Sequence, residues 1–382
     1  MEFERYLLKT LLNHLLPNKV NLIFGTRRVG KTYLLKQLTA RTAYRTLTLQ
    51  GEDYDTQQLL AQRSIANYRR LLDGVELLIV DEAQEITDIG LILKLIVDQI
   101  EPLRIVVTGS SAFDLANLSG EPLTGRAYFH QLYPLAQCEL APYENSLETR
   151  QRLDDRLVLG SYPELLQLSG TADRQEYLKN LVNTYLLKDI LAFEGVRNAA
   201  KVKDLLRLVA FQVGKEVSMD ELGRQLQSSK NTVEKYLDMF TKVFVLVRVG
   251  GFSRNLRKEV TKTSRWYFTD AGIRNALIND FRLPALRTDA GALWENYLIA
   301  ERLKILQAQR RPVEFFFWRT YDQQEIDWLE LENGQLRAYE FKWSDNRATI
   351  TRTKVPKAFA DAYPDATFTA IHRDNYLEFI GG

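Results

Sequence analysis

Eight consecutive residues near the N-terminus have the spacing Gly-x-x-x-x-Gly-Lys-Thr. They are Gly25, Thr26, Arg27, Arg28, Val29, Gly30, Lys31 and Thr32. In this spacing backbone N–H groups surround the α- and β-phosphates of a nucleotide, the lysine reaches the β- and γ-phosphates, and the threonine hydroxyl is a ligand of Mg²⁺. A strand-to-helix turn that binds nothing is the alternative. Residues 20–24 form an apolar run and residues 32–38 an apolar-periodic helix, which is the context that a phosphate-binding loop requires.

A second apolar run, residues 77–80, ends in two adjacent carboxylates, Asp81 and Glu82. We expect this strand to lie beside the strand that enters the loop and to direct Asp81 toward the Mg²⁺ shell. Glu82 is then the candidate base that orients and deprotonates the attacking water. A capped strand-to-helix turn is the alternative. The chain has no Asn-Lys-x-Asp motif, which argues against a GTPase.

A polar tip follows the apolar run at 104–108. It consists of Thr108-Gly109-Ser110-Ser111. We predict that Ser110 senses the γ-phosphate through a hydrogen bond to the attacking water. Ser111 is the other polar residue at this tip, and it can instead cap the next helix.

Arg126 comes just before the last apolar run of this region, residues 127–132. At that position an arginine can reach the γ-phosphate bound by a neighbouring subunit, where it accelerates hydrolysis by orders of magnitude. An ordinary salt bridge is the alternative. A catalytic Arg126 requires a homo-oligomer.

Strand and helix patterns alternate along residues 1–150. The strand candidates are 20–24, 44–49, 76–80, 104–108 and 127–132. Such alternation predicts an α/β fold with a parallel sheet that helices cover on both faces. Residues 151–196 have helical patterns only. We therefore predict a P-loop core over 1–150 and a helical lid over 151–196.

Composition restricts the class of protein. The chain has 382 residues, of which 45% are hydrophobic, and one cysteine, Cys138. A single cysteine excludes an intrachain disulfide, and His14, His130 and His372 show no metal-ligand spacing. No apolar run approaches the roughly 20 residues of a membrane helix, and the N-terminus lacks a signal-peptide segment. We predict a cytoplasmic protein without a membrane partner.

Positive charge is concentrated in the middle of the chain. The net charge is +2, yet residues 197–275 hold 16 lysines and arginines against 8 aspartates and glutamates. This asymmetry predicts a segment that meets a polyanion; a solvated basic face is the alternative.

Two amphipathic helices, 219–227 and 231–242, lie in this basic segment and precede a β-rich stretch. Their spacing is typical of a helix-turn-helix with a wing, so we predict a winged helix over 197–283. A structural appendage is the alternative to DNA binding. The apolar positions expected to join the helices are Leu222, Leu226, Val233, Leu237 and Phe240. The residues expected to face DNA are Lys230, Asn231, Thr232, Lys235, Arg254, Arg257, Lys258 and Lys262.

Residues 284–382 are predicted to form a third unit, an α/β domain. It opens with a helix over 290–308 and continues with strands over 315–319, 325–331 and 335–343. Asn333-Gly334 predicts a two-residue hairpin, in which paired positions sum to 667.

The predicted register places Asp327 opposite Glu340, and Glu325 opposite Lys342. Opposed carboxylates repel unless a cation or a proton lies between them. A divalent metal beside a lysine is an arrangement that cleaves phosphodiesters. The alternative is a Glu325–Lys342 ion pair on an inert sheet.

The motifs together resemble a known family. The octet, the Asp81-Glu82 strand, the Thr108–Ser111 tip and Arg126 resemble the core of AAA-type ATPases. Two further stretches, Gly160-Ser161-Tyr162-Pro163-Glu164 and Tyr185-Leu186-Leu187-Lys188-Asp189-Ile190, resemble prokaryotic AAA ATPases that carry a C-terminal domain of unknown function. The resemblance covers nearly the whole chain and implies ATP and Mg²⁺ binding, a winged helix and a nuclease-like C-terminal fold.

The C-terminal acids resemble a second pattern, that of the restriction-endonuclease-like fold. Asp327, Glu340 and Lys342 match its strand positions, and Glu295 matches its upstream helical acid. The resemblance implies that Glu295, Asp327 and Glu340 bind a second metal, with Asp327, Glu340 and Lys342 catalytic.

Three functions are compatible with these patterns. The first is an ATP-hydrolysing protein that couples nucleotide state to DNA binding and to Mg²⁺-dependent nucleic-acid cleavage. The second is an ATP-gated DNA-binding regulator whose nuclease fold is inactive. The third is a signalling or interaction ATPase whose C-terminal region contacts protein.

Overall fold

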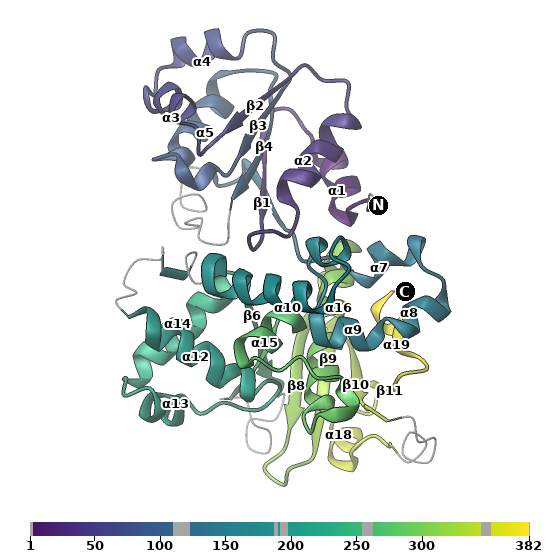
Figure 1. The fold of residues 1–382 in the computed structure, drawn as a ribbon. Helices are drawn as coiled ribbons and strands as arrows, with labels where there is room; N and C mark the ends of the chain where they lie inside the picture. The colour runs from purple at the N-terminus through teal and green to yellow at the C-terminus, as the bar shows by residue number, and fades with distance from the viewer. Residues whose placement is uncertain are drawn as a thin grey trace. The chain divides into compact units, whose positions relative to one another are not determined.

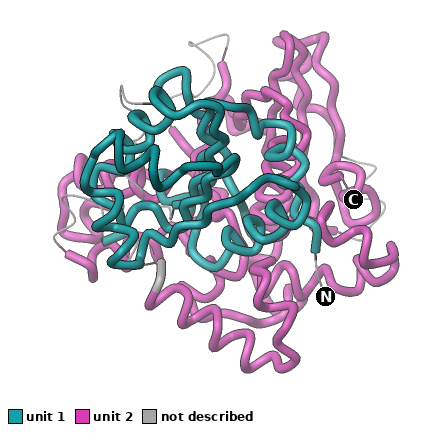
Figure 2. Tube along the Cα trace, turned by 90° about the horizontal axis from the view of Figure 1, so that it is seen from above, with its two compact units in different colours: residues 1–134, 188–196, 242–244 teal, residues 135–187, 197–241, 245–382 magenta. Residues whose placement is uncertain are grey.

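The computed structural model describes residues 3–109, 123–186, 190–191, 198–253, 263–344 and 353–381. The chain divides into two compact units (Figure 2). The first comprises residues 1–134, 188–196 and 242–244, and the second comprises residues 135–187, 197–241 and 245–382. Each unit has its own sheet and its own hydrophobic core.

The first unit contains a five-stranded parallel sheet with the order β2-β3-β4-β1-β5 (Figure 1). Its strands are β1 (Lys19–Phe24), β2 (Thr46–Gln50), β3 (Leu77–Asp81), β4 (Arg104–Gly109) and β5 (Ala127–Gln131). All five predicted strands are confirmed, each within two residues at either end, and every pairing is parallel.

One expectation about this sheet is wrong. The strand that ends in Asp81 does not lie beside the loop strand, because β4 lies between β3 and β1 and pairs with both. After Arg104, β4 is buried along its whole length, as a strand with a neighbour on each side must be.

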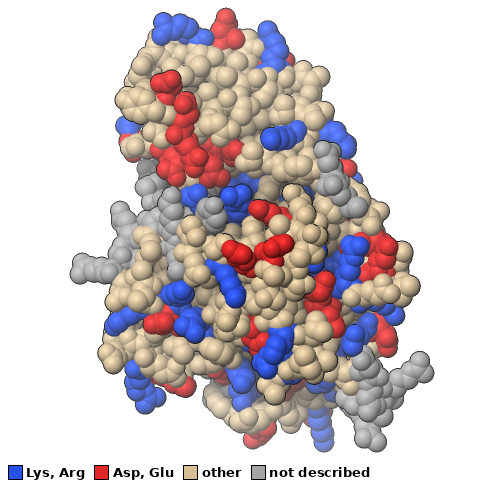
Figure 3. All heavy atoms as spheres, in the orientation of Figure 1, with Lys and Arg blue, Asp and Glu red and all other residues tan. Residues whose placement is uncertain are grey.

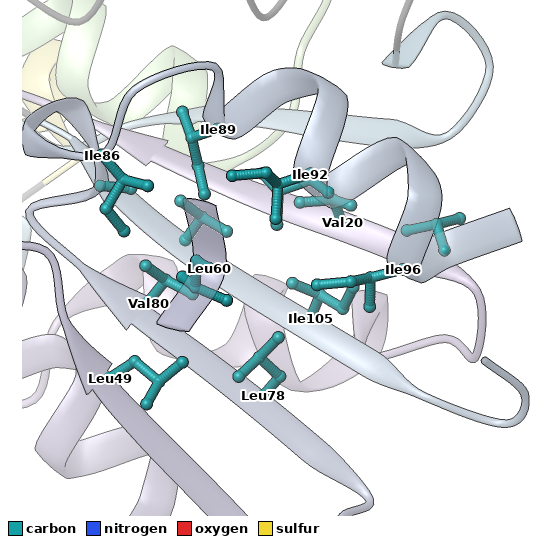
Figure 4. Close-up of a cluster of buried hydrophobic side chains, with 14 of the residues drawn as sticks. Val20, Leu49, Leu60, Leu78, Val80, Ile86, Ile89, Ile92, Ile96 and Ile105 are labelled. Atoms are coloured by element: carbon teal, nitrogen blue, oxygen red, sulfur yellow. The ribbon is translucent and has the colours of Figure 1, made fainter. Parts of the chain in front are cut away.

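Helices cover both faces of this sheet. They are α1 (Tyr6–His14), α2 (Lys31–Ala40), α3 (Tyr54–Ala61), α4 (Ile65–Leu71) and α5 (Ile89–Gln99). Figure 4 shows Ile92 and Ile96 of α5 against Val20, Leu78 and Ile105 of three neighbouring strands. Helices α1 and α2 contact each other on the other face (Figure 1).

The second unit contains a six-stranded mixed sheet with the order β11-β10-β9-β8-β6-β7. Its strands are β6 (Leu246–Gly251), β7 (Ser264–Phe268), β8 (Glu314–Arg319), β9 (Glu325–Glu332), β10 (Gln335–Phe341) and β11 (Thr367–Ile371). The three predicted C-terminal strands are β8, β9 and β10. The predicted wing strands, β6 and β7, join the same sheet because β6 pairs with β8 at Gly250–Phe316 and Gly251–Phe317.

The predicted hairpin is confirmed between β9 and β10. Asn333 and Gly334 have φ of 51° and 80°, so both central residues adopt the left-handed conformation of a type I′ turn. Paired positions run from Gln335–Glu332 to Tyr339–Trp328, each summing to the predicted 667.

The helices of the second unit include the predicted lid. Among the described residues they are α7 (Gln137–Leu140), α8 (Ser146–Gln151), α9 (Leu153–Leu159), α10 (Thr171–Asn180), the π-helix Leu181–Leu186, α12 (Ala199–Phe211), α13 (Met219–Gln225), α14 (Lys230–Lys242), α15 (Ala271–Ile278), α16 (Ala290–Ala308), α18 (Lys357–Ala362) and α19 (Tyr376–Ile380). The lid, winged-helix and C-terminal segments fall almost entirely within this one unit. The boundaries at 150, 196 and 283 stay predictions.

Within the part of the chain that the structure describes, no helix combines the length and apolarity needed to cross a membrane.

Helices α9 and α15 approach each other closely at two glycines. The carboxylate of Asp270 accepts the Ser161 N–H at 2.8 Å, beside Gly160, which has a φ of 75°. A Cβ at Gly272 would lie 2.1 Å from the carbonyl oxygen of Leu159. The Gly160–Glu164 stretch therefore has a packing role, since it lets α9 end against the start of α15.

Replacing Gly272 with alanine should destabilise the second unit. The new Cβ would meet backbone, which cannot rotate away, so α9 and α15 must separate at a cost of roughly 1–3 kcal/mol. Thermal and urea unfolding measure the loss. Gly291→Ala is the matched control, because Gly291 is also the second residue of its helix and a Cβ there meets nothing within 4 Å. Equal stabilities for the two variants would contradict the close approach.

Candidate functional site

The phosphate-binding motif forms the turn between β1 and α2. Arg28 and Gly30 have φ of 66° and 97°, so the chain passes through two left-handed positions before Lys31 begins the helix. A Cβ at Gly25 would lie 2.3 Å from the carbonyl oxygen of Leu132, which leaves room for glycine only. The backbone of the loop therefore requires both glycines of the motif.

Lys31, the residue predicted to bind phosphate, lies beside Glu82, the predicted base. The side chain is 5% exposed, and its Nζ donates to the Gly25 carbonyl oxygen at 3.0 Å. The same nitrogen lies 3.8 Å from the carboxylate of Glu82. Glu82 follows β3 with a φ of 51°, and its other carboxylate oxygen accepts from Gln84 Nε2 at 2.6 Å.

Asp81 connects three segments through its carboxylate. One oxygen accepts from the Thr32 hydroxyl at 2.8 Å, and the other accepts from the Thr108 hydroxyl. Thr108 Oγ1 also accepts the Glu82 N–H at 3.0 Å. Thr108 belongs to no residue-specific motif, and its only signal in the sequence is a hydroxyl inside an otherwise apolar strand.

The pair Thr32 and Asp81 fits the magnesium that the motif implies. A hydroxyl and a carboxylate are hard oxygen donors, and Mg²⁺ takes one or two such ligands and completes its shell with water and phosphate oxygens. Ser110, the predicted sensor, lies outside the described residues, and its role stays a prediction.

Arg126 lies at the opposite end of the sheet from the loop. Its carbonyl oxygen accepts the Val20 N–H at the start of β1, whereas the loop follows the end of β1. The guanidinium forms a two-point ion pair with Asp98, with N–O distances of 2.6 and 3.3 Å. Arg126 therefore does not serve the loop of its own chain, and its predicted action on a neighbour stays a prediction.

Helices α13 and α14 pack as the amphipathic pattern predicts. The five apolar positions are all buried: Leu222, Leu226, Val233, Leu237 and Phe240. Gly223 permits a tight turn, because the Ser228 N–H donates to its carbonyl at 2.9 Å and a Cβ would lie 2.8 Å from Ser228 O.

The outer surface of α14 carries both signs of charge. Lys230, Asn231 and Lys235 are exposed and Thr232 is half-buried, but Glu234 and Asp238 are exposed on the same helix. Figure 3 likewise shows acidic side chains interspersed with the basic ones over the second unit. The remaining predicted DNA contacts, Arg254, Arg257, Lys258 and Lys262, lie outside the described residues.

The C-terminal carboxylates surround an arginine that the sequence analysis missed. Arg265 of β7 is 5% exposed, and its guanidinium lies 4.6 Å from the centre of the Phe317 ring. It contacts the carboxylates of Glu325 at 2.7 Å, Glu295 at 3.7 Å and Asp327 at 3.7 Å. No local signal identifies this residue, because it lies in the predicted wing.

The remaining predicted members lie beside this group. Asp327 accepts the Phe341 N–H at 2.8 Å, and Lys342 Nζ donates to Glu340 at 2.7 Å. Lys342 therefore pairs with Glu340, two residues earlier in the chain. The second oxygen of Glu340 is buried and has no hydrogen-bond partner among the described residues.

Burial disfavours negative charge on two carboxylates of this cluster. Burial raises the pKa of Glu295 to about 7, and the neighbouring carboxylates add to the rise while Arg265 opposes it. Burial, together with Glu295 and Glu340, raises the pKa of Asp327 well above its ordinary value. The hydroxyl of Tyr267 donates to Glu295 at 2.5 Å.

The predicted second metal site, formed by Glu295, Asp327 and Glu340, stays a prediction. The guanidinium of Arg265 lies within 4 Å of two of its predicted ligands, Glu295 and Asp327, and of Glu325, which was not predicted as a ligand. Among the residues that the structure describes, no group of three or more His, Cys, Asp or Glu side chains is placed to hold a metal ion. The structure places the cations of Arg265 and Lys342 beside Glu295, Asp327 and Glu340.

Family models match three consecutive parts of the chain. Residues 17–141 match a family described as AAA domain. Residues 150–283 and 290–376 match two families described as domains of unknown function, DUF8612 and DUF4143.

Similar proteins occur in bacteria and archaea. The chain is 29% identical over 329 residues to the uncharacterized protein Rv2008c of Mycobacterium tuberculosis, covering 85% of this chain and 70% of that protein. It is 23% identical to an uncharacterized protein of Haemophilus influenzae, covering 81% and 79%. It is 22% identical to the uncharacterized protein MJ1544 of Methanocaldococcus jannaschii, covering 63% and 58%.

Solved structures show only a distant likeness. A signal transduction ATPase with numerous domains from Pyrococcus horikoshii is 12% identical, with 82% of this chain and 46% of that chain covered and a TM-score of 0.30. The RuvB Holliday junction branch migration motor of Thermotoga maritima is 16% identical, with 65% and 90% covered and a TM-score of 0.30.

The family match agrees with the geometry of the first unit. The matched residues contain the loop, Asp81, Glu82 and all five strands of the parallel sheet. Residues 17–141 therefore match the AAA domain family and have the loop and the parallel sheet of a P-loop domain.

Replacing Glu295 with glutamine tests the protonation of the C-terminal cluster. A carboxyl whose folded pKa is about 7 stabilises the fold below its unfolded value of about 4.5, and this stabilisation is lost as the pH rises through 7. Glutamine does not titrate and still accepts from Tyr267. The melting temperature of the variant, relative to wild type, should therefore rise by a few degrees between about pH 5 and about pH 8.

Glu332→Gln is the control for this measurement. Hydrogen bonds from Arg311 and Arg337 lower the pKa of Glu332 to about 2, so its titration lies below the measured range. Its difference from wild type should not change between the two pH values. An equally constant difference for Glu295→Gln would contradict the protonation assigned to Glu295.

Proposed function

We propose that this chain hydrolyses ATP with Mg²⁺ at the carboxyl edge of its parallel sheet. The observation that carries the proposal is a pair of contacts between the loop and the end of β3, Thr32 with Asp81 at 2.8 Å and Lys31 with Glu82 at 3.8 Å. Lys31 binds the β- and γ-phosphates. Thr32 and Asp81 would hold the Mg²⁺, which would neutralise charge on the phosphates.

Glu82 is the proposed general base. The hydrogen bond from its N–H to Thr108 fixes the backbone at the end of β3, and the hydrogen bond from Gln84 orients the carboxylate. A carboxylate held in this way can orient a water and accept its proton. Ser110 is the proposed sensor of the γ-phosphate. Arg126 is proposed to act on the nucleotide of a neighbouring copy in a homo-oligomer.

We further propose that nucleotide state controls DNA binding by α13 and α14. The exposed Lys230, Asn231 and Lys235 support this second function, while Glu234 and Asp238 limit the positive potential of the surface. Arg265 within the C-terminal cluster favours the regulator with an inactive nuclease fold over the active nuclease. The signalling ATPase that contacts protein is the remaining alternative.

Glu82→Gln should separate nucleotide binding from hydrolysis. The amide keeps the shape of the side chain but accepts no proton, so the ATPase rate should fall by about 10²-fold or more while ADP affinity stays within about twofold. Phosphate release and calorimetry measure the two quantities. Glu85→Gln, an exposed acid three residues away, is the control and should match wild type. A fully active Glu82→Gln enzyme would exclude Glu82 as the base.

The same variant tests Arg126. In a mixture of the two single variants, a Glu82→Gln copy supplies Arg126 and a neighbouring Arg126→Ala copy supplies an intact nucleotide site with Glu82. The mixture should hydrolyse ATP faster than either variant alone, because an arginine supplied by a neighbour is worth orders of magnitude in rate. A mixture no faster than the average of its components would show that Arg126 does not act between copies.

DNA binding is tested by the double variant Lys230→Ala/Lys235→Ala. Loss of two phosphate contacts should make the slope of log affinity against log salt shallower by about 2. Lys354→Ala/Lys357→Ala, which removes two exposed lysines outside these helices, is the charge-matched control. If DNA affinity does not depend on salt concentration and is unchanged when Arg257 and Lys258 are replaced, the ATPase that contacts protein is favoured.

Cleavage distinguishes the two DNA-binding functions. Incubation of wild type with DNA and RNA, with ATP and Mg²⁺ or Mn²⁺ varied independently, should yield no product. A cleavage product that disappears in Asp327→Ala would restore the nuclease function and contradict the role given to Arg265.

A further inference from the structure

A buried arginine outside the P-loop motif contacts the loop directly. Arg5 immediately precedes α1 and is 3% exposed. Its Nη1 donates to the carbonyl oxygen of Val29 at 2.5 Å, and its Nη2 donates to that of Tyr133 at 2.7 Å. Val29 is the loop residue before Gly30, and Tyr133 follows β5. One guanidinium therefore joins the N-terminal segment, the phosphate loop and the chain leaving the sheet.

The contact with Val29 bears on phosphate binding through the geometry of the peptide unit. In a planar trans peptide the C=O and the following N–H point in opposite directions. When Arg5 holds the Val29 carbonyl, it also sets the direction of the Gly30 N–H. Phosphate loops bind anions through N–H groups that converge on the ligand. The Arg5 guanidinium, which binds the Val29 carbonyl on one side of the peptide, thus keeps the Gly30 N–H on the other side in a fixed direction.

The N-terminal segment has a second attachment, to the helix that follows the loop. Gln37 of α2 accepts the Arg5 N–H at 3.2 Å and donates to the Phe3 carbonyl at 2.8 Å. Leu8 and Leu11 of α1 are buried, and α1 contacts α2. Docking of residues 3–14 and the conformation of the loop are therefore connected through Arg5 and Gln37.

We propose that Arg5 is a positioning residue of the nucleotide site and that residues 3–14 form a strap whose docking is linked to nucleotide binding. The proposal rests on the proposed function only in requiring that the loop binds nucleotide. Linkage is reciprocal: if the docked strap favours the binding conformation of the loop, bound nucleotide stabilises the docked strap by the same factor. Lysine cannot replace Arg5, because a single ammonium lacks the planar fork that reaches two carbonyls.

The test measures ADP affinity and hydrogen exchange in the full-length chain. Arg5→Met should weaken binding of a fluorescent ADP by about tenfold or more, since it removes two charge-assisted hydrogen bonds. Arg45→Met is the control, because Arg45 is a largely exposed arginine of the same unit and pairs with Glu76, which lies outside residues 3–14. Its ADP affinity should stay within about twofold of wild type.

Hydrogen exchange distinguishes positioning from a purely structural role. In wild type, saturating ADP should slow amide exchange in residues 3–14 as well as in α2. In Arg5→Met at saturating ADP, α2 should still be protected while residues 3–14 exchange as they do without ligand. Gln37→Ala removes the second attachment of residues 3–14 and should weaken ADP binding by about threefold. This variant replaces Arg5→Met in the test if Arg5→Met does not fold.

Each outcome has one meaning. If wild type binds no ADP, the proposed function fails. If wild type binds ADP and both Arg5→Met and Gln37→Ala bind it equally well, the proposed role of the strap is contradicted. The same holds if ADP leaves hydrogen exchange in residues 3–14 unchanged. In both cases the proposed ATPase function is unaffected.

Discussion

The nucleotide edge of the first unit depends on one buried carboxylate. Asp81 is 2% exposed, and both of its oxygens accept hydrogen bonds from threonine hydroxyls, Thr32 at the start of α2 and Thr108 in β4. A buried charge without partners would cost several kcal/mol, so this network must be complete for the edge to form. Since Thr108 also holds the Glu82 N–H, the proposed base depends on the same network. The place of β4 between β3 and β1 is what brings Thr108 to Asp81.

The second unit also contains a buried charge that requires partners, but here the central charge is the cation of Arg265. Arg265 is buried among three carboxylates and stacked on Phe317, so the cluster carries its own cation. Buried ion pairs contribute little net stability, but removing one partner leaves an uncompensated charge, which is costly. The carboxylates that were predicted to bind a metal thus also contact a buried cation of the protein. This cluster lies on a continuous sheet that runs from β7 to β11.

Local patterns predicted the parts of the fold that local physics controls. Asn333-Gly334 set the register of β9 and β10, because only residues that tolerate positive φ form a type I′ turn. The five apolar strands of the first unit and the buried faces of α13 and α14 followed equally from periodicity. What periodicity does not contain is strand order. The position of β4, the addition of β6 and β7 to the C-terminal sheet and the existence of β11 all required long-range pairing.

Site residues divide in the same way. The spacing of Gly25, Gly30, Lys31 and Thr32 is itself the signal for a phosphate loop, because consecutive peptides supply the binding groups. Arg5 and Arg265 had no such signal. Each lies far along the chain from the groups that it contacts, and an arginine in a sequence looks the same whether it is solvated or buried.

The sequence by itself determined the phosphate loop, its acidic strand and the alternation of elements that places both at one sheet edge. Only the tertiary structure decided which hydroxyl completes the Asp81 network, which residue braces the loop from outside and what lies among the C-terminal carboxylates. The physical reason is the range of the interactions. Backbone conformation and amphipathic burial are specified within a few residues, whereas charge compensation in a buried site depends on whichever side chains the fold brings together.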